Sequence, residues 1–188
     1  SEKINFENIK YLVNKDYMGT EQLFSLMKAR SYFSGDLIVS FGDIIYDEKI
    51  LKHLVNQSAN FLLAVDSNWK QSYEKRPDNP AIFADFISHN NGVVNRFFTQ
   101  LDKKLDSYDE VVEFIGLMKL SPNASEIFLK QYLAMEKLDP KSVEKLKIIS
   151  FLEELRKSKV DFSISKVKDK WCEIDTAQDL EIARKMFG

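Results

Sequence analysis

Short, continuous apolar runs separated by segments of helical spacing are the feature that most constrains how this sequence folds. The clearest run is Asn60–Val65, where apolar residues follow one another instead of alternating with polar ones. A run of this kind is typical of a strand covered on both faces. Asp36–Phe41 has the same character and ends abruptly at Gly42-Asp43.

The same alternation of strand and helix continues along the chain. Further strands are expected at Ile9–Asn14, Val112–Leu120 and Val160–Val167. Helices are expected from Thr20, after Asp47, and over Pro122–Leu138, Lys141–Lys157 and Thr176–Met186. Between them, Ala81–His89 and Val93–Thr99 flank Asn90-Asn91-Gly92, a sequence typical of a hairpin turn.

This order of elements predicts an α/β fold with an open, mainly parallel sheet, helices on both faces and a β-hairpin excursion. The length of 188 residues and the lack of a low-complexity linker favour one domain over residues 1–188.

Composition excludes several functional classes. A net charge of −2 leaves no broad basic surface, so we expect no nucleic-acid partner. The single cysteine, Cys172, allows neither an intramolecular disulfide nor a cysteine-rich zinc site. The longest apolar stretches are too short to span a bilayer and no signal peptide is visible, so we expect a cytoplasmic protein without a membrane partner.

Two aspartates follow expected strands. Ligands of open α/β sheets bind beyond the carboxyl ends of the strands. Asp43 follows the Asp36–Phe41 run, and Asp175 lies between the last expected strand and the last helix. Together they could bind Mg²⁺, which prefers one or two carboxylates with phosphate oxygens and water. Spacing alone, however, favours ordinary roles at a strand end and a helix N-terminus.

Two other groups of residues have a functional and a structural interpretation. Gly19-Thr20 opens a helix, and this could offer N–H groups to a ligand or simply be a helix cap. Trp69, Tyr73 and Arg76 share one face if that segment is helical. Such a face could hold a cationic or phosphate-bearing ligand, although packing is the commoner use.

Several motifs together resemble the sugar-nucleotidyltransferase-like superfamily. They are Thr20–Leu26, Ile38–Asp47, and Trp171–Thr176 with Asp179-Leu180. Two segments, Asp66–Arg76 and Glu113–Ser121, resemble the phosphocholine cytidylyltransferases and the nucleotidyltransferases of phosphonate synthesis. The resemblance runs along nearly the whole chain.

The resemblance implies a nucleotide-diphospho-sugar-transferase-like, Rossmann-like fold and a Mg²⁺-dependent transfer of CMP from CTP to a small phosphate or phosphonate acceptor. It implies that Asp43 and Asp175 are the catalytic, metal-binding residues. It places Gly19, Thr20 and Asp43 at the nucleotide. At the acceptor, of phosphocholine or 2-aminoethylphosphonate type, it places Trp69, Tyr73, Arg76, Glu113 and Glu173. A homo-oligomer is compatible with it.

The sequence departs from the family at its start. The family begins with a strand, a glycine-rich loop carrying an arginine, and a later Pro-Lys, which hold the triphosphate. None of these precedes the segment at Gly19, so we expect a fragment that lacks the N-terminal part of the fold and has little activity alone. Two alternatives stay open: a sugar-1-phosphate nucleotidyltransferase that makes an NDP-sugar, and a non-catalytic nucleotide-binding or partner domain.

Overall fold

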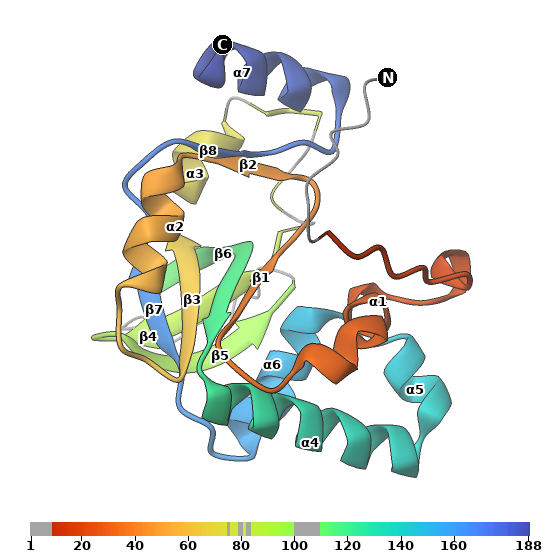
Figure 1. Cartoon of the computed structure of the whole chain (residues 1–188). Coiled ribbons are helices and arrows are strands. Elements are labelled where there is room, and N and C mark those ends of the chain that lie inside the picture. The colour runs from red at the N-terminus through yellow and green to blue at the C-terminus, as the bar shows by residue number, and fades with distance from the viewer. Residues whose placement is uncertain (1–8, 75, 79–80, 82–83, 100–109) are drawn as a thin grey trace.

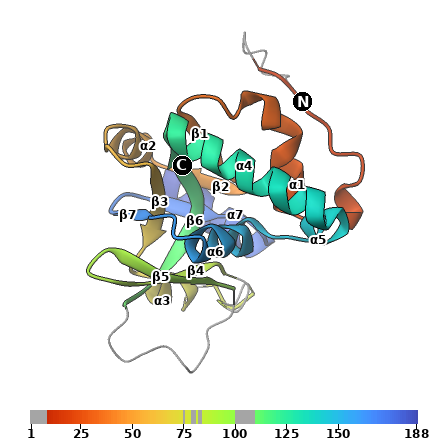
Figure 2. The same ribbon diagram turned by 90° about the horizontal axis from the view of Figure 1, so that it is seen from below.

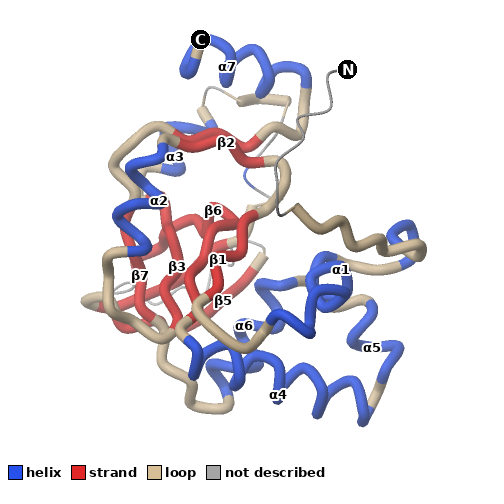
Figure 3. The backbone as a smooth tube through the Cα atoms, in the orientation of Figure 1, coloured by secondary structure: helices blue, strands red, loops and turns tan. Residues whose placement is uncertain are grey.

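A six-stranded main sheet and a separate two-stranded ladder form the frame of the molecule (Figures 1 and 3). The computed structural model describes residues 9–74, 76–78, 81, 84–99 and 110–188. The main sheet has the order β5-β4-β6-β3-β7, and β1 also pairs with β6. Its strands are β1 (Leu37–Ser40), β3 (Phe61–Asp66), β4 (Phe86–Asn90), β5 (Val93–Phe98), β6 (Glu110–Leu120) and β7 (Ser163–Lys166). The separate ladder pairs β2 (Ile44–Tyr46) with β8 (Trp171–Glu173).

Strand direction corrects one part of the predicted architecture. Among the described ladders, β3–β7 is parallel, whereas β1–β6, β3–β6, β4–β6 and β4–β5 are antiparallel. The long strand β6 accounts for three of these, because it runs against β1, β3 and β4, and the fourth is the β4–β5 hairpin. Four strands (β1, β3, β4 and β7) still point in one direction, so their carboxyl ends lie toward the same edge.

Helices cover both faces of the main sheet, as predicted (Figures 1 and 2). On one face α2 packs with its apolar side against β3 and β6. On the other face the larger core forms beneath helices α1, α4 and α6. The helices are α1 (Gln22–Leu26), α2 (Glu48–Val55), α3 (Trp69–Tyr73), α4 (Pro122–Leu138), α5 (Pro140–Glu144), α6 (Ile148–Lys157) and α7 (Ala177–Phe187), with 3₁₀ turns at Tyr17–Gly19 and Met27–Tyr32.

Local sequence signals set several of these boundaries. The Asp47 side chain caps α2 by accepting from Lys49 N, and Ser121 caps α4 in front of Pro122. Thr176 and Asp179 form the capping box of α7, which confirms that prediction. The predicted hairpin turn is confirmed at Asn91 and Gly92, which both have positive φ.

Three predictions of elements need correction. Ile9–Asn14 forms no strand, and Tyr11 and Val13 in it are exposed without a neighbouring strand to cover them. The short strands β2 and β8 were not expected, since three residues give too little pattern to recognise. The helix expected over Lys141–Lys157 is interrupted between α5 and α6.

Among the described residues, no helix has both the length and the hydrophobicity that a bilayer span requires. Residues 82 and 83 of the predicted strand Ala81–His89 lie outside the described ranges. The predicted strand Val93–Thr99 ends where a described range ends.

Candidate active site

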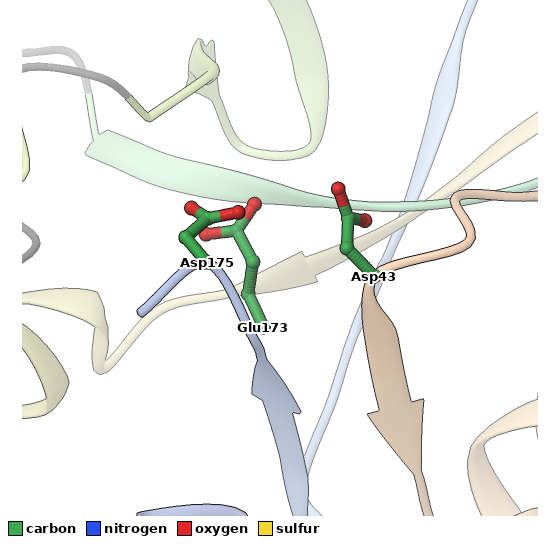
Figure 4. A group of neighbouring side chains, drawn as sticks. All are labelled: Asp43, Glu173 and Asp175. Atoms are coloured by element: carbon green, nitrogen blue, oxygen red, sulfur yellow. The ribbon is translucent and has the colours of Figure 1, made fainter. Parts of the chain in front are cut away.

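The β2–β8 ladder brings the two predicted metal-binding aspartates together. Ile44 pairs with Glu173, and the backbone N–H of Ile174 donates to the carbonyl of Asp43 at 2.8 Å. Asp43 therefore lies beside the turn that carries Glu173 and Asp175. Figure 4 shows the three side chains, Asp43 from the start of β2 and the other two from the end of β8, rising on the same side of the ladder.

The three carboxylates are close enough to share one cation. One oxygen from each of Asp43, Glu173 and Asp175 lies within 4.8 Å of the others. Burial, followed by the charges of Asp175 and Asp43, raises the pKa of Glu173 to about 7. This donor set consists of hard oxygen ligands, which suit Mg²⁺ better than a softer metal.

The carboxylate cluster forms one wall of a polar cleft, which we call the acid cleft. Its lining comes from β6, β8, the start of α1 and the segments before β4 and α6. Asp85, Glu113 and Lys147 join the three cluster carboxylates there, together with Gln22, Phe41, Ala84, Phe114, Ile115, Gly116 and Trp171. Of the described lining residues, Lys147 is the single cation, so the cleft is strongly acidic.

A second cleft adjoins the first and shares Asp43, Phe41 and Gln22 with it. We call it the Thr20 cleft; it is completed by Thr20, Glu21, Ser25, Leu26, Val39, Ser40, Gly42 and Ile148. The Thr20 hydroxyl donates to the carbonyl of Asp16 and accepts from the Asn14 amide. Gly19 ends a 3₁₀ turn beside Thr20 but does not line the cleft. None of the described lining residues is a lysine or arginine.

Trp69 and Tyr73 lie on one helix, α3, as the spacing predicted, but they support the acid cleft from behind. Trp69 is buried against Phe86, and its indole N–H donates to the carbonyl of Val111 at 3.1 Å. The Tyr73 hydroxyl donates to Glu113 Oε1 at 2.6 Å. Trp69 and Tyr73 thus fix the position of Glu113, and neither is among the residues that line the cleft.

Arg76 has a similar supporting position. Its guanidinium is buried and paired with Asp179 Oδ1 at 2.6 Å, and it lies 3.6 Å from Glu173 Oε2. Its Nη2 also donates to the backbone carbonyl of Glu173. Burial alone would raise the pKa of Asp179, but the hydrogen bonds from Arg76 and Thr176 outweigh it and lower the pKa to about 2. Arg76 therefore ties Glu173 to the first turn of α7.

Two residues of the acid cleft were not predicted from the sequence. Asp85 precedes β4 without a motif, and burial raises its pKa to about 6 although the nearby Lys147 opposes the shift. Lys147 is the N-cap residue of α6, a position hidden by the expectation of an unbroken helix. Glu173, predicted at the acceptor, lies beside Asp43 and Asp175, the two aspartates predicted to bind metal. The sequence signal for this position was that Glu173 lies two residues before Asp175.

Comparison with known proteins supports the resemblance seen in the sequence. The chain is 28% identical over 186 residues to the CTP:phosphoglutamine cytidylyltransferase of Campylobacter jejuni subsp. jejuni serotype O:2, covering 92% of this chain and 70% of that protein. No family model matches the chain.

Two solved structures share the fold. The CTP:phosphocholine cytidylyltransferase from Streptococcus pneumoniae matches with a TM-score of 0.64 at 10% identity, over 93% of this chain and 67% of that one. The inositol-1-phosphate CTP transferase from T. maritima matches with a TM-score of 0.62 at 16% identity, over 92% of this chain. The chain spans 63% of the length of the T. maritima protein.

These findings confirm the predicted superfamily resemblance, the α/β fold class and the nucleotidyltransferase class of the relatives. The roles of the individual side chains stay predictions. Five of the predicted residues line two adjoining clefts that meet at Asp43, namely Thr20, Asp43, Glu113, Glu173 and Asp175. The other four, Gly19, Trp69, Tyr73 and Arg76, line neither cleft.

Proposed function

We propose that this chain, which has the fold of the sugar-nucleotidyltransferase-like superfamily and a cytidylyltransferase among its relatives, transfers CMP from CTP to a small phosphate or phosphonate acceptor. The observation that carries the proposal is the convergence of Asp43, Glu173 and Asp175 where the two clefts meet. CTP would lie in the Thr20 cleft and the acceptor in the acid cleft. Asp43 then faces both substrates.

The reaction balances without a covalent enzyme intermediate. An oxygen of the acceptor phosphate or phosphonate attacks the α-phosphorus of CTP, and the bond to the β-phosphate breaks. Pyrophosphate leaves with the electron pair. The acceptor oxygen is already anionic near neutral pH, so no side chain has to remove a proton from it. The demands on the protein are positioning and charge neutralisation.

The carboxylate cluster is the proposed Mg²⁺ site. Mg²⁺ bound there would offset the negative charge of the triphosphate and of the departing pyrophosphate. Arg76 holds Glu173 toward this site through its buried pair with Asp179. We further propose that cationic partners of the triphosphate come from outside the described lining of the Thr20 cleft, because that lining contains no lysine or arginine.

Metal binding by the chain is the first test. Replacing Asp43 or Asp175 with asparagine removes one anionic ligand while keeping the size of the side chain. We expect each variant to bind Mn²⁺, as a paramagnetic probe for Mg²⁺, at least tenfold more weakly. The matched control is Asp169→Asn, an exposed aspartate outside both clefts. Equal Mn²⁺ affinity in all four proteins would contradict the metal assignment.

Turnover is the second test, and it uses the full-length product of the gene that encodes this chain. Pyrophosphate release is measured with CTP, UTP, dTTP or ATP against 2-aminoethylphosphonate, phosphocholine or glucose 1-phosphate. We expect CTP with an amino-phosphonate or amino-alcohol phosphate to be fastest, and Asp43→Asn to abolish the release. Preference for glucose 1-phosphate would indicate an NDP-sugar enzyme instead. Nucleotide binding without turnover of any pair would indicate a binding domain.

A further inference from the structure

The carboxylate of Glu113 has one oxygen that receives no hydrogen bond from the described residues. Glu113 lies on β6, is 3% exposed and lines the acid cleft. Its Oε1 accepts from Tyr73, whereas its Oε2 is buried and has no hydrogen bond from any described residue. A buried, unsatisfied carboxylate oxygen is costly, so a group that binds in the cleft and donates to it would gain affinity.

The guanidinium of Arg76, which lies near Glu113, is already engaged. Arg76 packs its guanidinium 5.1 Å from the centre of the Tyr73 ring, but its hydrogen bonds go to Asp179 and the carbonyl of Glu173. The indole N–H of Trp69 is likewise committed to Val111. Among the described residues, neither of these side chains donates to Glu113 Oε2, so a molecule bound in the cleft could supply the missing charge and hydrogen bond.

A second carboxylate, that of Asp85, also lines the acid cleft. Asp85 precedes β4, which pairs with β6 beside Glu113, and the Asp85 carbonyl accepts from the N–H of Phe114 at 2.8 Å. No described residue donates a hydrogen bond to the Asp85 carboxylate. Burial raises the pKa of both side chains, to about 6 for Asp85 and about 8 for Glu113. Both shifts reflect carboxylates held without sufficient compensating charge.

We propose that Glu113 selects an acceptor whose far end carries a primary ammonium group, which donates an N–H hydrogen bond to Glu113 Oε2. The inference rests on the proposed function, which places the acceptor phosphate beside Asp43. A quaternary ammonium carries the same charge but has no N–H, so it leaves Oε2 unsatisfied. The site thereby discriminates between amines that differ only in methylation.

The test is an acceptor series that changes the number of N–H groups at constant charge. Phosphoethanolamine, its N-methyl and N,N-dimethyl derivatives, and phosphocholine are titrated into the chain with Mg²⁺ and CMP by calorimetry. Ethyl phosphate serves as the acceptor without an amine. We expect affinity to fall along the series, by about 10- to 100-fold between phosphoethanolamine and phosphocholine, as for one charge-assisted hydrogen bond.

A variant locates the effect. Glu113→Gln keeps the shape and an oxygen for the Tyr73 hydroxyl, but it removes the charge. We expect this variant to bind all members of the series with nearly equal affinity, while Glu126→Gln on the exposed side of α4 keeps the full preference. If Glu113→Gln does not fold, the series measured on the unchanged chain decides the inference alone.

The outcomes separate the two proposals. Acceptors that bind with the same affinity whatever their methylation, or a preference that survives Glu113→Gln, would overturn this inference and leave the proposed function standing. Binding of no phosphorylated acceptor, ethyl phosphate included, would overturn the proposed placement of the acceptor and this inference with it.

Discussion

At the residue scale, the acidic side chains of the site divide into a group that forms the proposed cation site and a group that is bound by the protein. Asp43, Glu173 and Asp175 converge, and Arg76 lies 3.6 Å from Glu173 Oε2. Asp179, only four residues beyond Asp175, is fully buried and neutralised by Arg76. Neighbouring carboxylates on one short segment therefore have opposite environments and different roles.

The Arg76–Asp179 pair makes a prediction about stability in acid. The pKa of Asp179 is lowered from 3.8 to about 2 in the folded state, so its contribution to stability is complete above about pH 5. That contribution is lost as the pH falls through 4 toward 2. We expect Asp179→Asn to lower the free energy of unfolding at pH 6 by roughly 2 kcal/mol. Urea denaturation at several pH values measures it.

The diagnostic quantity is the difference between the two proteins. This difference should shrink between pH 4 and pH 2, because the native carboxylate then becomes protonated. The other titrating groups are common to both proteins and cancel. A difference that stays constant over this range would mean that Asp179 acts through shape alone.

Gly116 makes a second prediction at this scale. It has φ +77° within β6, and a Cβ there would lie 2.6 Å from Cδ2 of Phe41, which lines both clefts. We expect Gly116→Ala to destabilise the protein by roughly 1–3 kcal/mol because it adds backbone strain and displaces the ring. The urea unfolding midpoint is the measurement. Gly35→Ala is the control, since nothing lies within 4 Å of its added methyl group. Equal midpoints for the two variants would contradict the prediction.

At the element scale, the break between α5 and α6 gives the acid cleft its basic residue. The chain leaves helical geometry after Glu144 and re-enters it at Ile148, with Lys147 in an extended conformation as the N-cap residue. In a continuous helix the direction of the Lys147 side chain would be set by the helical geometry of the residues around it. The interruption instead turns it toward the cleft that Asp85 lines.

We expect Lys147 to attract the phosphate of the acceptor. Lys147→Gln should weaken the binding of phosphoethanolamine about two- to fivefold, the range expected of an exposed charge pair. Lys145→Gln, an exposed lysine in the same interruption that lines neither cleft, should have no effect. Calorimetry measures both variants. An equal loss in the two would indicate a general effect of charge.

Elements with strong local signals were predictable from the sequence, whereas elements made by tertiary pairing were not. Pro122–Leu138 was predicted with its observed limits because Ser121-Pro122 opens it and apolar spacing continues through it. β2 and β8 exist because each satisfies the other across the fold. Asp43 and Asp175 were named without knowledge of that ladder. Glu113 and Tyr73 were both predicted at the acceptor, but the hydrogen bond between them was not, because that contact depends on the fold.

At the scale of the whole molecule, β6 explains why the predicted direction of the sheet was incomplete. Apolar runs reveal that a strand is buried, but they carry no information about which neighbour it pairs with. β6 runs antiparallel to β1, β3 and β4, and it contributes Glu113 and Gly116 to the acid cleft. One reversed strand thus supplies a wall of the site while its neighbours end at the same edge.

The β2–β8 ladder also determines when the site can form. It pairs Ile44–Tyr46 with Trp171–Glu173. Forming this ladder therefore costs the conformational entropy of closing a long loop. During synthesis Asp43 leaves the ribosome long before Glu173 and Asp175. For most of that time the nascent chain holds a single carboxylate of the cluster and cannot capture a cation in a half-built site. The three carboxylates can therefore come together only after most of the chain between them has been made.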